Sequence, residues 1–252
     1  MAQHWDVIVV GGGLAGLTAG ATAAAGGATT LVLEAEAPGG RARTHTERGF
    51  VFNRGAHALY LGGAGWKVLS ELGVQVTGAK PPLARYRARR SGDLHLLPTG
   101  PGTLLRTTLV GTRGKAQLGR FLARLPRIDT SGLAAISMSQ WLDDLDLRTD
   151  VRAVVAAVVR IATYSEDLEQ LSAGAVIEQL QAASRDGVLY VDGGFSSMVT
   201  ALERKVQVRS ATRVLTLAPG RDGLELETDG GRLAGRRVIL APGTPDATLA
   251  LL

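Results

Sequence analysis

We expect an α/β protein with a parallel sheet, and three observations near the N-terminus predict it. An apolar run at 6–10 leads directly into a glycine-rich turn at 11–16. A second apolar run, 29–33, ends on an acid, Glu34. A second glycine turn, this one containing arginines, follows at 39–44. Strand, glycine turn, helix, strand and acid, in that order, is the layout of a dinucleotide-binding βαβ unit.

Each glycine of the first turn has a physical role in such a unit. Gly11 allows a tight turn from strand to helix, and Gly13 has no side chain, so a pyrophosphate can approach its backbone. Gly16 lets the helix pack close to the strand. The phosphates would then meet the free N–H groups of the helix start, at Leu14 and Ala15, and the positive end of the helix dipole.

Glu34 is the expected ribose ligand of this unit. It lies 18 residues after Gly16, close to the spacing of about 20 that is typical of the unit. A carboxylate at the strand end can accept hydrogen bonds from both ribose hydroxyls and would repel a 2′-phosphate, which disfavours NADP. The glycine pattern alone is weak evidence because the chain has 33 glycines. NAD and FAD also use the same unit, so the choice between them depends on the second glycine turn.

The second turn and the segments after it resemble a known family. The chain is similar to the flavin-dependent amine oxidases and their relatives, the phytoene (carotenoid) desaturases and the protoporphyrinogen oxidases. The resemblance covers both ends of the chain, whereas the middle, about 81–187, matches only loosely. The matching segments are 7–16, 32–35, 39–44, 49–57, 192–196, 212–214, 229–230 and 238–241.

The resemblance implies FAD as cofactor and a glutathione-reductase-like flavin fold, and it assigns roles by position. The backbone from Gly11 to Gly16 would hold the pyrophosphate, and Glu34 with Ala35 would bind the adenosine ribose. Gly40 and Arg41 would lie along the pyrophosphate and ribityl chain, with Arg41 supplying a charge-assisted contact. The remaining expected cofactor residues are Ala56 and His57, near the flavin ring, and Val214, whose backbone would pair with the adenine edge.

The chain also departs from the family pattern. Position 36 is usually basic and is Glu36 here, and Asn53 stands where an acid is common. Family members are considerably longer, and a further turn that closes over the flavin would lie beyond Leu252. We therefore expect this chain alone to hold FAD weakly, through its adenosine half, and to self-associate.

Two domains are expected. Residues 1–80 and 188–252 would form a discontinuous FAD-binding domain, and 81–187 an inserted, mostly helical α+β domain that shapes the substrate site. Apolar spacing predicts helices at 111–125, 139–147, 150–164, 167–183 and 195–205. Alternation predicts a hairpin at 85–98 and strands at 188–191, 213–218, 224–228 and 237–241, and composition predicts a loop at 98–102.

Composition excludes several kinds of chemistry. The chain has no cysteine, so disulfides, iron–sulfur clusters and thiolate catalysis are excluded within it. Its four histidines show no metal-ligand spacing, and we predict no metal site. No apolar run of about 18 residues and no signal peptide is present, so we expect a cytoplasmic protein. The net charge of +5 and the arginine cluster 85–90 favour a solvated hairpin rim over nucleic-acid binding, with weak attraction to anionic membrane surfaces as an alternative.

The expected function is that of an FAD-dependent oxidoreductase acting on a hydrophobic small molecule. Aromatic residues make up only 4% of the chain, whereas the resemblance implies aromatic rings around an amine substrate. A desaturase-like (phytoene/carotenoid-type) substrate is therefore preferred, with a flavin amine oxidase as the alternative. A truncated, non-catalytic flavin-fold protein is the alternative from another class. His57 could be a proton acceptor beside the flavin or an ordinary loop histidine, so no catalytic residue is assigned and the oligomeric state is left open.

Overall fold

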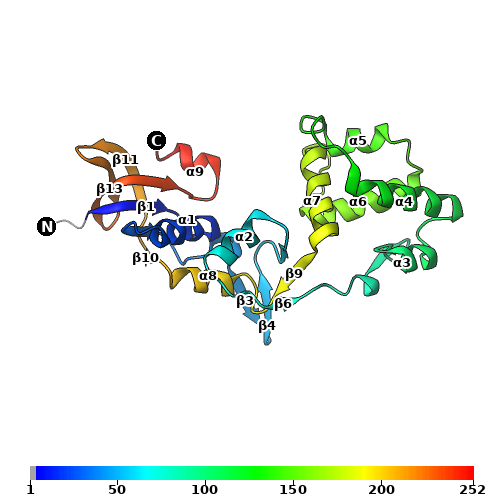
Figure 1. Cartoon of the computed structure of the whole chain (residues 1–252), viewed down its shortest axis with the longest axis horizontal. Helices are drawn as coiled ribbons and strands as arrows, with labels where there is room; N and C mark the ends of the chain where they lie inside the picture. Colours follow the sequence, from blue (N-terminus) through cyan, green and yellow to red (C-terminus); the bar gives the residue numbers. More distant parts are fainter. Residues whose placement is uncertain (1–3) are drawn as a thin grey trace. The chain divides into compact units, whose positions relative to one another are not determined.

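The structure, a computed structural model, describes residues 4–252 and divides into two compact units (Figure 1). Unit 1 comprises residues up to 59 together with 63–79 and 189–252. Unit 2 comprises 60–62 and 80–188. Each unit has its own hydrophobic core.

Unit 1 is built on a six-stranded sheet with the order β10-β2-β1-β13-β12-β11. The first four strands in this order are parallel, and the last two are added by antiparallel pairing. Strands β1 and β2 are neighbours joined through helix α1, which confirms the predicted βαβ unit. The bounds are β1 Trp5–Val10, β2 Thr30–Leu33, β10 Gln207–Arg209, β11 Val214–Gly220, β12 Gly223–Thr228 and β13 Gly231–Leu240.

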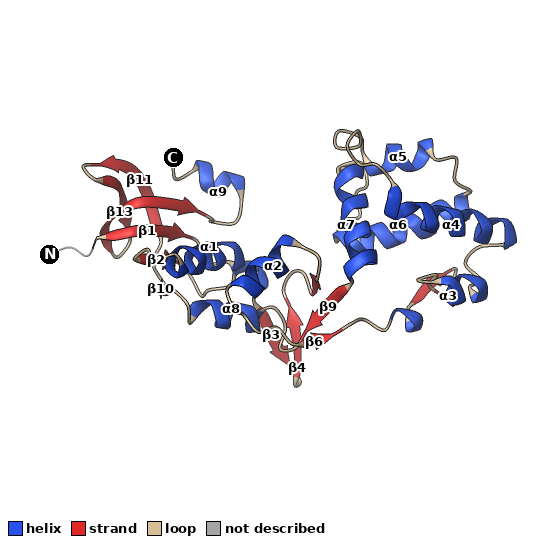
Figure 2. Ribbon diagram, in the orientation of Figure 1, coloured by secondary structure: helices blue, strands red, loops and turns tan. Residues whose placement is uncertain are grey.

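Apolar side chains cover both faces of the central strands. On one face, Val7, Val9 and Val32 pack with side chains of α1 (Leu14–Ala25) and α8 (Ser196–Glu203). On the other face, Ile8 and Leu31 pack in a second cluster that includes residues of β11 and β12. Strands buried on both faces are expected to be continuously apolar, which explains the composition of the runs that predicted them. The helices and strands of unit 1 are distinguished in Figure 2.

Smaller elements complete unit 1. Strands β3 (Thr44–Glu47) and β4 (Phe50–Asn53) form a hairpin that the sequence analysis did not predict. A three-stranded sheet has the order β5-β9-β6, with β5 at Ala58–Tyr60, β6 at Gly78–Ala79 and β9 at Val188–Val191. The remaining helices are α2 (Ala64–Glu71) and α9 (Pro245–Leu249).

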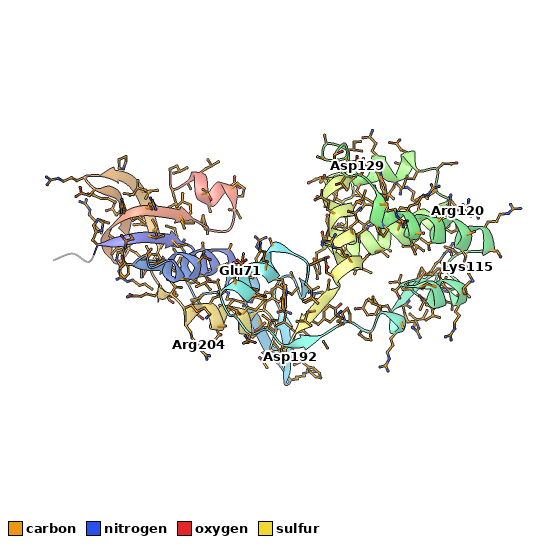
Figure 3. The ribbon with its side chains drawn as sticks, in the orientation of Figure 1. Glu71, Lys115, Arg120, Asp129, Asp192 and Arg204 are labelled. Carbon is orange, nitrogen blue, oxygen red and sulfur yellow. The ribbon has the colours of Figure 1, made fainter. Side chains whose placement is uncertain are left out.

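Unit 2 is mainly helical, with one hairpin. Its core cluster draws buried side chains from α4, α5, α6 and α7, and Leu104 of α3 packs against it. The buried members are almost entirely aliphatic, with Trp141 as the one aromatic residue among them. Lys115 of α4, labelled in Figure 3, donates from Nζ to the carbonyl oxygen of Leu105 in α3 over 2.7 Å. The elements are β7 (Arg87–Arg90), β8 (Asp93–Leu96), α3 (Pro101–Arg106), α4 (Thr112–Arg124), α5 (Met138–Asp144), α6 (Thr149–Thr163) and α7 (Ala173–Asp186).

Two expectations in unit 2 are wrong. The helix predicted at 167–183 begins only at Ala173, because the hydroxyl of Ser172 caps α7 by accepting the N–H of Ala175 and the segment before it pairs with α5. In that pairing Met138 donates its N–H to the carbonyl of Leu171 over 2.7 Å. The loop predicted at 98–102 also ends early, since α3 begins at Pro101, where proline is favourable in the first helical turn.

No helix within residues 4–252 is both long enough and apolar enough to cross a membrane.

Candidate dinucleotide site

The first glycine turn connects β1 to α1 in a conformation that requires glycine. Gly11 has φ +106°, and a Cβ there would overlap the carbonyl oxygen of Ala241. A Cβ at Gly16 would overlap the carbonyl oxygen of Gly11. The start of α1 therefore packs directly on the turn, as the predicted roles of Gly11 and Gly16 require.

The start of α1 is open where a pyrophosphate is expected. A Cβ built on Gly13, the N-cap residue, would meet no atom within 4 Å. Within residues 4–252, no side chain caps this helix and no acid lies in its first turn. The N–H groups of Leu14 and Ala15 lie in that turn, where backbone N–H groups have no partner within the helix. These donors and the helix dipole suit an anionic group.

The second glycine turn lies directly against the first. Gly39 donates its N–H to the carbonyl of Gly12 over 2.7 Å, and Gly39 and Gly13 form an isolated parallel bridge. Gly39 and Gly40 both have positive φ, +112° and +51°. Arg41 follows at once in a short 3₁₀ turn, Gly40–Ala42, and its side chain is exposed. The structure thus brings Gly13, Gly40 and Arg41 to one place.

Glu34 is held by backbone donors on both sides. Its Oε2 accepts the N–H of Gly12 over 2.7 Å, and its Oε1 accepts the N–H of Glu36 over 2.9 Å. Each carboxylate oxygen can accept a further hydrogen bond, so the group remains able to bind two hydroxyls. Ala35, between these contacts, is half-buried. The carboxylate is therefore oriented beside the first glycine turn before any ligand arrives.

Gly12 is a site residue that the sequence analysis did not single out. A Cβ at Gly12 would lie 2.8 Å from the Cβ of Glu34. Any larger residue would displace the carboxylate from its backbone donors. The only signal in the sequence was the third consecutive glycine in 11–13.

Val214 begins β11, and the segment before it runs along the Glu34 strand end. Thr212 donates its N–H to the carbonyl of Glu34 over 2.9 Å, and Ala211 donates to the carbonyl of Glu36. The side chain of Val214 is buried in a core cluster of unit 1, and Val214 pairs with Thr228 of the neighbouring strand β12. The resemblance assigns the backbone of Val214 a contact with the adenine edge. That contact stays a prediction.

Ala56 and His57 lie in the loop after β4, and both are exposed. This loop starts beside the second glycine turn, because Arg54 donates its N–H to the carbonyl of Arg43 over 2.9 Å. The ring of His57 meets the ring of Tyr190 edge-on, with 5.3 Å between centroids. Their position near the flavin ring stays a prediction.

The departure at position 36 has a structural counterpart in Arg43. The guanidinium of Arg43 forms an ion pair with Glu36, with 3.2 Å between NH2 and Oε2. The Nε of Arg43 is buried and has no hydrogen-bond partner among the described residues. The family usually has a basic residue at position 36. Here Glu36 instead forms an ion pair with a basic residue, Arg43, beside the second glycine turn.

Asn53, the second departure, joins distant parts of unit 1. Its Oδ1 accepts the N–H of Phe195 over 2.8 Å. Next to it, the hydroxyl of Ser196 accepts the N–H of Thr44 over 2.9 Å. The second glycine turn is thereby anchored to the start of α8, and an amide is sufficient at position 53 because the bond needs only an acceptor.

These features together fit a dinucleotide. The open space at Gly13 and the uncapped helix start suit a pyrophosphate, and the fixed carboxylate of Glu34 suits a ribose diol. The arginines that follow the second glycine turn suit further phosphate or polar groups. No group of three or more histidine or acidic side chains within residues 4–252 could hold a metal ion.

Comparison with known proteins finds similarity both in sequence and in fold. The chain is 29% identical, over 199 residues, to coproporphyrinogen III oxidase of Propionibacterium freudenreichii subsp. freudenreichii, covering 73% of this chain and 36% of the relative. It is similar in fold to an oxidoreductase from Methanosarcina mazei, with a TM-score of 0.73, 18% identity, and coverage of 94% of this chain and 58% of that one. A triple mutant of putrescine oxidase gives a TM-score of 0.74 at 20% identity, covering 99% of this chain and 60% of that one.

The chain thus spans about a third of the curated relative and about three fifths of the similar structures. The sequence family described as flavin containing amine oxidoreductase matches residues 14–248, which is nearly the whole chain. On that match, the chain belongs to the flavin containing amine oxidoreductase family.

Proposed function

We propose that this chain carries the FAD-binding site of an oxidoreductase that removes hydrogen from a hydrophobic substrate. The observation that carries the proposal is the hydrogen-bonded pairing of the two glycine turns, Gly39 on Gly12, with Glu34 fixed beside them. FAD is the cofactor that a flavin containing family implies, and the site fits its adenosine and pyrophosphate parts. When bound, the flavin ring accepts a hydride or its equivalent from the substrate.

The chain's own residues would bind and orient that cofactor. The N–H groups at the start of α1 and the exposed Arg41 would hold the pyrophosphate, and Glu34 would accept the ribose hydroxyls. Val214 would hold the adenine edge, and Ala56 and His57 would lie along the flavin. Unit 1 would thus be the cofactor domain and unit 2 the substrate domain.

A desaturase-like substrate is our preferred proposal. The core of unit 2 is built from Leu, Val, Ile and Ala side chains, with few aromatic rings, which favours a hydrocarbon over an amine held between aromatic residues. The alternative is a flavin amine oxidase, and the fold similarity to putrescine oxidase keeps that alternative open. A weak association of the arginine-rich segment 85–90 with anionic lipid would suit a membrane-dissolved substrate.

The cofactor proposal is tested by titrating the purified chain with FAD and with NAD⁺, and by identifying any nucleotide released on denaturation. Saturable binding of FAD, with much weaker binding of NAD⁺, supports it. A folded, colourless chain that does not take up FAD would support the non-catalytic alternative. Anaerobic reduction of the flavin by a polyprenoid or by a diamine then separates the two substrate classes.

A further inference from the structure

Unit 2 contains a cavity of its own, of about 660 Å³. This volume falls within the roughly 300–1,000 Å³ that is typical of pockets for small organic ligands. It lies between strand β7 and the N-terminal half of α6. Its lining residues are Ala88, Arg89, Arg90, Leu97, Leu109, Arg148, Thr149, Asp150, Ala153, Val154 and Ala157. All of them belong to unit 2, and none is a predicted cofactor ligand.

One part of the lining is apolar and fixed. Leu97, Leu109 and Val154 are buried members of the core cluster of unit 2, so their positions are set by packing behind them. Ala88 and Ala153 line the cavity with small side chains, which leave the volume open. Such a surface stabilises an apolar ligand body by removing it from water.

The other part of the lining is strongly basic. It carries three arginines, Arg89, Arg90 and Arg148, and one acid, Asp150. Arg148 is paired with Asp150, with 3.2 Å between Nε and Oδ1. Within residues 4–252, no acidic side chain forms an ion pair with either of the other two arginines. The lining therefore has an unbalanced positive charge.

The structure also orients one of these charges, that of Arg90. The guanidinium of Arg90 donates from NH1 to the carbonyl of Leu109 over 2.7 Å, which ties the hairpin to the apolar wall. The first turns of α6 contribute Thr149, Asp150, Ala153 and Val154 to the lining, so the N-terminal end of that helix, where the dipole is positive, lies on the same side as the arginines. Guanidinium groups beside an apolar wall match a carboxylate attached to an apolar body.

We propose that this cavity binds an amphipathic carboxylate: a small organic molecule whose apolar body lies against Leu97, Leu109 and Val154 and whose carboxylate meets Arg89 and Arg90. The site is independent of the proposed cofactor site. FAD affinity is measured on the wild-type chain and on each variant. Loss of carboxylate binding with unchanged FAD affinity concerns this site alone, whereas failure to bind FAD concerns the cofactor proposal.

The test uses two probes with the same apolar body, 1-pyrenebutyrate and its neutral analogue 1-pyrenebutanol, in equilibrium dialysis against the full chain. The variant Arg89→Glu reverses one charge of the lining. Arg87→Glu makes the same change on the same strand at a residue outside the lining. The wild-type chain should bind the carboxylate about tenfold more tightly than the alcohol, and Arg89→Glu should remove that preference while Arg87→Glu keeps it. Equal loss in both variants, or no preference in the wild-type chain, overturns the proposal.

A second variant tests the position of the ligand. Ala153→Trp would fill the cavity from α6 and should weaken both probes about tenfold. If thermal unfolding shows that the Ala153→Trp variant is not folded, Ala157→Leu replaces it in the test. Leucine at position 157 also fills part of the cavity and is a strong helix former. Unchanged binding of both probes in the folded filled variant means that they bind elsewhere, and the proposal is then wrong.

Discussion

The carboxylate of Glu34 accepts a hydrogen bond from the backbone N–H of Gly12, with 2.7 Å between Oε2 and the nitrogen. The same glycine accepts, through its carbonyl oxygen, the N–H of Gly39 over 2.7 Å. Gly12 thus joins Glu34, the proposed ribose ligand, to the second glycine turn.

Replacing Glu34 by Ala should weaken FAD binding by well over tenfold. Two hydrogen bonds from the ribose to a charged carboxylate are lost, each worth about 1.5–3 kcal/mol. Isothermal titration calorimetry gives the dissociation constant. Glu36→Gln is the matched control, because it removes a nearby exposed acid whose one ion pair among the described residues is with Arg43. It should change FAD affinity less than about threefold, since an exposed ion pair contributes little. Equal effects of the two variants would show that Glu34 is not a ligand of FAD.

Gly13→Val should abolish FAD binding and leave the fold intact. A side chain at this position enters free space in the structure, which is the space expected for the pyrophosphate. Gly16→Val provides the contrast, because its side chain would overlap the carbonyl oxygen of Gly11 and should destabilise unit 1 itself. Thermal unfolding without ligand distinguishes the two variants. A Gly13→Val chain that unfolds as easily as Gly16→Val would contradict this assignment.

Asn53→Leu should destabilise the chain by about 1–3 kcal/mol, because the partly buried N–H of Phe195 would lose its acceptor. Asn53→Asp keeps an oxygen at the same place and should cost much less. Urea unfolding of the three proteins measures the difference. Equal stability of all three would show that the bond between Asn53 and Phe195 contributes nothing to the anchoring of the second glycine turn.

The free energy of unfolding should depend on pH through Asp6, which lies in the first strand of the sheet. Hydrogen bonds from the hydroxyl and N–H of Thr29 lower the pKa of Asp6 below its ordinary value of 3.8. A lowered pKa in the folded state stabilises the protein above pH 3.8, and this contribution is lost as the pH falls through the folded pKa. Asp6→Asn should therefore show a smaller loss of stability between pH 5 and pH 2.5 than the wild-type chain. Identical pH profiles in urea unfolding would show that the group contributes nothing.

Local patterns predicted much of unit 1. The βαβ unit depends on apolar runs and glycines within about 30 residues, so its strands, its helix and the roles of Gly11 and Gly16 could be predicted. The contact of Asn53 with Phe195 joins residues 142 apart in the chain, and no local pattern encodes it. The role of Gly12 could not be predicted for the same reason. A side chain is excluded at Gly12 because the residue lies against Glu34, which is 22 positions away in the chain.

The errors in unit 2 have a similar cause. The segment 167–172 has acids and apolar residues at spacings that suit a helix, but Leu171 is drawn into backbone pairing with Met138 and Ser172 caps the helix that follows. The hairpin at 44–53 was missed because its strands are short and largely exposed, without the alternation that marks a half-buried strand. The cavity between β7 and α6 depends on tertiary packing, so the sequence showed only its arginines.

The most direct test of the central claim, that the paired glycine turns and Glu34 form an FAD site, is a calorimetric titration of the full chain with FAD, ADP and FMN. The account predicts saturable binding of FAD, competition by ADP because it shares the adenosine and pyrophosphate parts, no comparable binding of FMN, and loss of FAD binding in folded Gly13→Val. FMN binding as tightly as FAD, or wild-type FAD affinity in folded Gly13→Val, would contradict it.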